Sequence, residues 1–338
     1  MTFLRLAAPV WLAAASALLL SGCAGATSAE DDGRIAIVAS TDVYAQIAEA
    51  IGGDFVDATA IVSSSGQDPH SFEPSARDQL TVQRADLILE NGGGYDAFVD
   101  ALIEASGSTA PVITAVEFSH EWPDNPGHGA GTAEGEHSED EHSEQEHGDE
   151  EHPDEEHADH QHIEGFNEHV WYDPHTMQHL AEEIAHELAD LMPAEAATFE
   201  DHATEFAAGI AELEAALGEI DAAHAGAEVF VTEPVSLYLV EAAGLVNVTP
   251  DAFSEAVEEG QDVAPSTLLD SLKLLRSGNV DVVIANTQTG GAETTDVLAE
   301  AEALSIPVVE FSETVPDGAT YLSWMQANID SLAGALAP

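Results

Sequence analysis

Short runs of aliphatic and β-branched residues alternate with longer stretches of helical periodicity along the first part of the chain. A run of four to eight such residues between polar residues is typical of a strand that is buried on both faces. Between the runs, one helical pattern ends at Gly52-Gly53 and another lies near residues 74–84. The runs that predict strands are 34–40, 55–62, 86–91 and 111–115.

The same alternation returns in the last third of the chain. A helical pattern over 267–279 ends on Gly278-Asn279, which is a good helix stop. Strands that alternate with helices predict an α/β fold with parallel sheets. We therefore expect two pseudo-symmetric lobes, each a four-stranded, mostly parallel sheet flanked by helices, although no close sequence repeat relates them. The second set of predicted strands is 228–233, 245–249, 280–286 and 307–311.

A single long helical pattern separates the two halves. Its apolar positions recur at the spacing of one helical face, and they are Phe199, Phe206, Ile210, Leu213, Leu217 and Ile220. A helix of about 28 residues spans about 40 Å, enough to brace two lobes. The pattern lasts too few heptads to indicate a coiled coil. The expected division is an N-terminal lobe over 34–192, a linking helix over 193–225 and a C-terminal lobe over 226–338.

The first residues are typical of a secreted lipoprotein. Arg5 precedes an apolar stretch from Leu6 to Leu20, which is short for a membrane span, so a signal peptide over 1–22 is favoured over an anchor helix. Leu20-Ser-Gly-Cys23 resembles a bacterial lipobox, and Cys23 is the only cysteine, so it has no disulfide partner. We expect lipidation at Cys23, a tether over 23–33 and a location on the outer face of the cell membrane.

The charge balance is extreme, with 65 acidic residues against 6 Lys and Arg. Only 17 of the acids lie in residues 119–165, so the polar segment there does not account for the excess. Nucleic acid is excluded as a partner, because neutralising phosphates requires Lys and Arg. A surface adapted to high salt, where like charges are screened, explains the bulk acidity.

The polar segment repeats an acid-histidine pair every five residues and holds almost no apolar side chains. Such a composition cannot form a core, so we expect disorder over 120–165. Neutral imidazoles bind transition metals, and the neighbouring acids attract cations. The segment is therefore either a weak metal collector or a solvated spacer. Its candidate metal-collecting residues are His137, His142, His147, His152, His157, His160 and His162.

Four further stretches place ligand-type side chains at strand ends or in loops. They centre on His70, His169, Glu233 and Glu313. The carboxyl ends of strands in open α/β sheets are where such folds bind ligands. Taken singly, each residue has an ordinary explanation, since loop histidines and strand-end glutamates are usually just solvated.

Taken together, these stretches resemble the zinc/manganese-type solute-binding proteins of ABC importers over essentially all of residues 35–336. Asp68-Pro-His70-Ser-Phe-Glu-Pro-Ser75 is similar to the first-histidine motif of that family, and Asn167-Glu-His169-Val-Trp-Tyr-Asp-Pro174 to the second. Residues 85–94 and 321–328 resemble its third-strand segment and the start of its last helix. The histidine-rich run also falls where the family's zinc receptors carry theirs.

The resemblance implies a metal ion held between two lobes by two residues from each. On this chain they are His70, His169, Glu233 and Glu313. The family's fourth ligand is usually Asp, so Glu313 is a departure, and Asp317 is the alternative. Glu233 favours manganese, because that metal prefers oxygen, whereas the imidazole run favours zinc. We expect zinc, with manganese as the alternative cargo.

The resemblance further implies a non-catalytic, monomeric receptor that delivers the metal to an ABC permease. A secreted metallohydrolase is a competing hypothesis, although it needs an open metal position and a general base, and no HExxH motif is present. A metal buffer or adhesin without a permease is a third.

Overall fold

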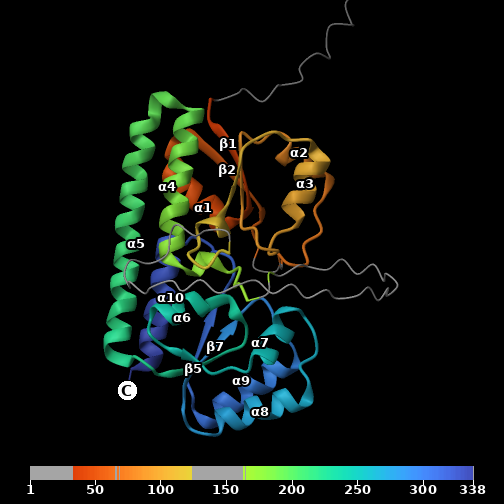
Figure 1. Ribbon diagram of the computed structural model, residues 1–338, viewed down its shortest axis with the longest axis vertical. Coiled ribbons are helices and arrows are strands. Elements are labelled where there is room, and N and C mark those ends of the chain that lie inside the picture. The colour runs from red at the N-terminus through yellow and green to blue at the C-terminus, as the bar shows by residue number, and fades with distance from the viewer. Residues whose placement is uncertain (1–32, 65–66, 68, 124–162, 164, 338) are drawn as a thin grey trace, which may run out of the picture. The chain divides into compact units, whose positions relative to one another are not determined.

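Eight strands form two separate sheets in the part of the chain that the computed structural model describes, residues 33–64, 67, 69–123, 163 and 165–337 (Figure 1). The strands are β1 (Ile35–Thr41), β2 (Val56–Val62), β3 (Leu87–Glu90), β4 (Val112–Thr114), β5 (Glu228–Val231), β6 (Val246–Asn247), β7 (Val280–Asn286) and β8 (Val308–Phe311). The sheet orders are β2-β1-β3-β4 and β6-β5-β7-β8, and every neighbouring pair is parallel. The predicted α/β fold with two four-stranded parallel sheets is confirmed.

Helices cover both faces of each sheet, as parallel sheets require. The described α-helices are α1 (Asp42–Gly52), α2 (Ala76–Val82), α3 (Phe98–Ser106), α4 (Pro174–Leu191), α5 (Ala196–His224), α6 (Leu237–Ala242), α7 (Asp251–Glu258), α8 (Pro265–Leu275), α9 (Ala292–Leu304) and α10 (Tyr321–Leu336). Single 3₁₀ turns are η1 (Gly53–Phe55), η2 (Ala115–Phe118), η3 (Val170–Tyr172), η4 (Pro193–Glu195) and η5 (Pro234–Ser236). We call the first sheet with α1 to α4 the N-terminal lobe and the second sheet with α6 to α10 the C-terminal lobe.

The strands are apolar on both faces because side chains alternate across a sheet. In β1, Ile37 and Ala39 join the largest apolar cluster, while Val38 packs toward α2 and α3. In β7, Ile284 joins that same large cluster, while Val283 faces the cluster formed with α7, α8 and α9. One apolar cluster therefore reaches from the first sheet to the second.

Helix α5 runs along both lobes and connects them (Figure 1). It has 29 residues, and the six apolar positions named from the sequence are all buried. It packs against α1, α4, α6 and α10. Gly209 permits a close approach to α10, because a Cβ there would lie 2.5 Å from Leu322 Cδ1. The helix therefore contacts helices of both lobes along its length.

Local sequence signals set several helix starts. Asp173 caps α4 by accepting a hydrogen bond from the His175 amide at 3.1 Å, with Pro174 in the first turn, as the sequence predicts. Ser75 and Asp78 form a capping box on α2, and Thr320 and Ser323 form one on α10. These caps place the loops before the helices, which carry the candidate metal ligands.

The signal peptide, Cys23, the tether up to residue 32 and the seven candidate histidines from His137 to His162 lie outside the described residues. Trp122, inside the segment expected to be disordered, instead packs against Phe166 with ring centroids 5.1 Å apart. Within the described parts, no helix combines the length and apolar character needed to cross a membrane.

Candidate metal centre

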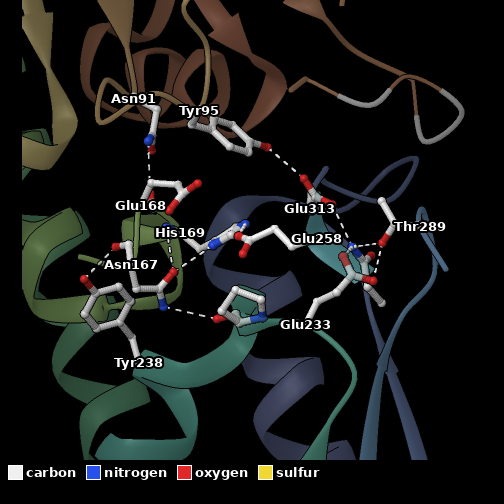
Figure 2. Close-up of polar contacts among 12 residues, drawn as sticks. Asn91, Tyr95, Asn167, Glu168, His169, Glu233, Tyr238, Glu258, Thr289 and Glu313 are labelled. Atoms are coloured by element: carbon white, nitrogen blue, oxygen red, sulfur yellow. Dashed lines mark hydrogen bonds and ion pairs between the residues drawn. The ribbon is translucent and has the colours of Figure 1, made fainter. Parts of the chain in front are cut away.

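His169 lies just before η3 with its ring almost completely buried, at 1% exposure. Its Nδ1 is 2.7 Å from Asn167 Oδ1, and because that oxygen only accepts, Nδ1 carries the proton. Asn167 is itself held by the C-terminal lobe: its Nδ2 donates to Pro234 O at 3.1 Å, and Tyr238 donates to its carbonyl at 2.7 Å (Figure 2). The ring of His169 is thereby held in the tautomer whose Nε2 carries the lone pair that can bind a metal.

His70 follows β2, in the loop before α2, and is half-buried. Its ring centroid is 5.9 Å from that of His169 and 4.8 Å from that of Tyr95. The two histidines are 99 residues apart in the sequence, and the fold brings their rings side by side. Together they supply two imidazoles to one point between the lobes.

Glu313 comes from the opposite lobe, two residues after β8, and its side chain is buried at 1% exposure. A ligand-type atom from each of His70, His169 and Glu313 lies within 4.8 Å of the others. Tyr95 donates a hydrogen bond across the lobes to Glu313 Oε2 at 3.1 Å (Figure 2). Gln288 accepts from the Glu313 amide at 2.6 Å and so fixes the loop. Three of the predicted ligands therefore converge.

Glu233 lies beside this group rather than in it. It follows β5, is buried, and accepts a hydrogen bond from Thr289 Oγ1 and another from Asn286 Nδ2, the latter at 3.1 Å. Asn286 Nδ2 also lies 2.7 Å from Glu313 Oε1. The Asn286 amide therefore holds the two carboxylates near each other.

Asp317, the alternative fourth ligand, is exposed in the loop before α10. It belongs to neither metal-type group found among the described residues. The reason is local: after Glu313 the chain turns outward through Pro316 and Gly318, both exposed. Glu313 is thus the better placed of the two.

Two further acids face the centre and were not singled out from the sequence. Glu258, at the end of α7, and Glu168 form a second metal-type group with His70. Glu258 Oε1 is 3.8 Å from His169 Nε2 (Figure 2) and, within the described residues, has no hydrogen-bond partner. Burial first, and then the carboxylates of Glu168, Glu233 and Glu313, raises the pKa of Glu258 to about 9.

No Lys or Arg of the described residues stands among the buried acids of the centre. The five Lys and Arg residues within the described parts are exposed, and the pairs that Lys273 and Arg276 form lie on α8 and α9. A buried cluster of carboxyls without a counter-cation is costly unless the groups are protonated or a cation binds. Two imidazoles and several carboxylates are also donors that Zn²⁺ and Mn²⁺ accept. The arrangement fits a divalent metal.

The supporting residues differ in how far the sequence signals them. Asn286 is a polar residue at the carboxyl end of a predicted strand, and such positions often lie at binding sites, so the sequence could have indicated it. Glu258 gave no signal, because it stands in an acidic stretch of an acidic chain. Tyr95, similarly, reads only as an aromatic core residue, which it also is.

Comparison with known proteins agrees with the fold. The family model described as "Zinc-uptake complex component A periplasmic" matches residues 37–335. The zinc-binding lipoprotein AdcA of Streptococcus pneumoniae is 25% identical over 328 residues, covering 95% of this chain and 59% of AdcA. The manganese ABC transporter substrate-binding lipoprotein PsaA of the same species is 35% identical over 99 residues, 28% of this chain and 32% of PsaA. The chain thus aligns with less than two thirds of either relative.

Solved structures share the fold. A crystal structure of ZnuA superposes with a TM-score of 0.66 at 19% identity, covering 90% of this chain and all of that one. FpvC of Pseudomonas aeruginosa with Ni²⁺ gives 0.65 at 21% identity, covering 90% and 97%. At such identities the likeness concerns the fold alone.

The family model covers most of the chain, and its members are solute-binding receptors of ABC importers, so the metallohydrolase hypothesis is set aside. On the match over residues 37–335, the chain belongs to the family of periplasmic zinc-uptake components, the metal solute-binding proteins of ABC importers.

Proposed function

We propose that the chain captures a divalent metal ion outside the cytoplasm and delivers it to the permease of an ABC importer. The observation that carries this proposal is the convergence of His70, His169 and Glu313, within 4.8 Å of one another, beside further buried acids. A dication supplies the missing charge. Glu233, hydrogen-bonded to the same Asn286 as Glu313, is the proposed fourth ligand.

Zinc is the proposed cargo. Two imidazole nitrogens suit zinc better than manganese, which binds such donors more weakly. The second candidate, a manganese receptor, is favoured by the number of carboxylates, since Glu168, Glu233, Glu258 and Glu313 offer oxygen. The similarity to PsaA, named for manganese, points the same way.

A lipid on Cys23 is the proposed membrane attachment, in keeping with the lipoprotein names of AdcA and PsaA. The histidine-rich segment is proposed to collect metal at several weak sites. Deletion of residues 128–162 is then expected to leave one tight site and remove the weak ones in a calorimetric titration. An unchanged number of bound zinc ions would refute metal collection by the histidine-rich segment but not the proposed receptor function.

The test of the receptor is a competition titration of zinc against manganese on the purified protein. We expect one tight site that prefers zinc. Replacing both His70 and His169 by Ala is expected to weaken that site by at least about 100-fold, because the remaining donors are carboxylates alone. His186→Ala, an exposed histidine of α4, is the matched control. Undiminished tight binding by the double variant would overturn the proposal.

A further inference from the structure

Helix α4 carries a pair of histidines outside the centre between the lobes. His175 and His179 are four residues apart, so they lie on one face of the helix. Their ring centroids are 4.8 Å apart at 87°, and their Nε2 atoms are 3.3 Å apart. His175 is exposed, and His179 is partly exposed. The pair is accessible to ions from solvent.

The outer nitrogen of each ring faces a carboxylate. Glu214 Oε1, from α5, is 3.8 Å from His175 Nδ1, and Glu182 Oε2 is 3.4 Å from His179 Nδ1. A carboxylate beside Nδ1 favours a proton on that nitrogen. The two Nε2 atoms lie within hydrogen-bond distance of each other, so a proton on one of them would be donated to the other. A divalent cation can take the place of that proton and bind both nitrogens.

The separation of the two nitrogens matches a metal. Two nitrogens bound to one tetrahedral ion at about 2.05 Å are about 3.3 Å apart, by the geometry of the tetrahedral angle. The Nε2 atoms are already 3.3 Å apart. Little reorganisation of the helix or the rings is therefore needed for chelation.

The surroundings leave room for the other ligands of the ion. His175 and Glu214 line a surface hollow of about 410 Å³, together with His120 and Asp173. His120 Nδ1 is 3.7 Å from Asp173 Oδ2 within this hollow. The hollow leaves space for further ligands beside His175, and the carboxylates of Asp173 and Glu214 raise the local concentration of cations.

We propose that His175 and His179 form a second, surface-exposed binding site for a late first-row divalent ion of the zinc, nickel and copper class. The two Nε2 atoms are the ligands, water completes the coordination, and Glu182 and Glu214 orient the rings. Because both protein ligands are imidazoles, manganese binds this site poorly. The site uses no residue of the centre between the lobes.

The test is the rate at which diethyl pyrocarbonate modifies each histidine of the full chain, measured by peptide mass spectrometry with and without zinc. A metal-bound nitrogen has no lone pair to react, so zinc is expected to slow modification of His175 and His179 about tenfold. His186, on the same helix and 3.8 Å from Glu183 three residues before it, is the internal control. Manganese at the same concentration is expected to protect neither member of the pair.

A single substitution tests chelation by the pair. In His179→Gln, zinc is expected to lose its protection of His175, because one imidazole alone binds weakly. The double variant His70→Ala with His169→Ala is expected to keep the protection, which separates this site from the proposed receptor function. Equal modification of His175 with and without zinc, or protection of His175 that survives His179→Gln, would overturn the proposal.

Discussion

The two lobes carry the same short pattern on the third strand of each sheet. Asp86-Leu-Ile-Leu-Glu-Asn91 in one corresponds to Asp281-Val-Val-Ile-Ala-Asn286 in the other. Asp86 Oδ2 accepts from the Ala36 amide at 2.9 Å, and Asp281 Oδ2 accepts from the Glu228 amide at 3.0 Å. Each aspartate ties the start of its strand to the neighbouring central strand. A local repeat therefore underlies the pseudo-symmetry, although no close repeat was expected from the sequence.

The asparagines at the other end of the pattern have different partners. Asn91 accepts from the Tyr44 hydroxyl and donates through Nδ2 to the carbonyls of Gly92, at 2.9 Å, and Glu168, at 3.0 Å. Asn286 donates to the carboxylates of Glu233 and Glu313. One amide therefore shapes the backbone that presents an imidazole, and the other holds carboxylates. The N-terminal lobe supplies the imidazole nitrogens of the metal centre, and the C-terminal lobe supplies much of its negative charge.

The largest effect is expected from the imidazole side. His169→Ala should weaken zinc binding by about 100-fold, which lowers the zinc-induced gain in the free energy of unfolding by about 2.7 kcal/mol at saturating zinc. Chemical denaturation with and without zinc measures it. An unchanged gain would mean that His169 does not bind the ion.

The carboxylate side is tested at Asn286. Asn286→Leu removes a donor shared by Glu233 and Glu313, and loss of such an orienting group typically costs about 10–100-fold in metal affinity. Calorimetric titration of zinc measures this loss. If affinity is unchanged, the amide does not orient the ligands.

The equivalent change in the N-terminal lobe is expected to act on stability. Asn91→Leu leaves the buried Tyr44 hydroxyl and the Glu168 carbonyl without their partner, which costs about 1–3 kcal/mol in the free energy of unfolding. Urea denaturation of the metal-free protein measures it. A larger loss of stability in Asn286→Leu than in Asn91→Leu would contradict the contrast between the lobes.

The lobes also differ at the residue before each asparagine, which is Glu90 in the N-terminal lobe and Ala285 in the C-terminal lobe. Burial first, and then Asp96, raises the pKa of Glu90 to about 7, against the hydrogen bond from Thr114 at 2.8 Å. The folded state thus holds this proton more tightly than the unfolded state. Below about pH 4.5 Glu90 is protonated in both states and does not lower the free energy of unfolding. As the pH rises to about 7, ionisation of Glu90 lowers the free energy of unfolding by about 1–2 kcal/mol after allowance for solvent screening.

Glu90→Gln is expected to remove this part of the pH dependence. Thermal denaturation of the metal-free protein between pH 4.5 and 8 compares the variant with the parent. Asp86→Asn, at the exposed start of the same strand, is a control for a nearby change of charge. Identical pH profiles in Glu90→Gln and the parent would show that Glu90 ionises without penalty.

The smallest effect is expected from the hydrogen bond that crosses the lobes. Tyr95→Phe removes the donor to Glu313 Oε2 but keeps the ring against His70 and Trp171. The expected loss of zinc affinity is less than about tenfold, because a single hydrogen bond to a charged group contributes about 1.5–3 kcal/mol at most and metal binding partly replaces it. Competition against a zinc chelator measures the loss. A loss of zinc affinity as large as that in His169→Ala would mean that the Tyr95 hydroxyl contributes as much to zinc binding as a metal ligand does.

Much of the fold could be predicted from the sequence, because its signals are local. All eight strands lie where apolar runs predicted them, the six apolar positions named for α5 are buried, and Asp173-Pro174 begins α4. Periodicity and capping act within a few residues, so they can be read without the rest of the chain. The resemblance to metal receptors was confirmed by the family match.

The composition of the centre was decided only by the tertiary structure. Glu258 and Glu168 are two acids among 65, and only their placement beside His70 and His169 in the folded chain distinguishes them. The same holds for the placement of Glu233 beside the convergent group, with Asn286 between it and Glu313. Distances between residues far apart in sequence depend on how whole sheets and helices pack, whereas strand and helix propensities depend on neighbours along the chain. The local pattern therefore determined the elements, and packing selected the side chains that meet.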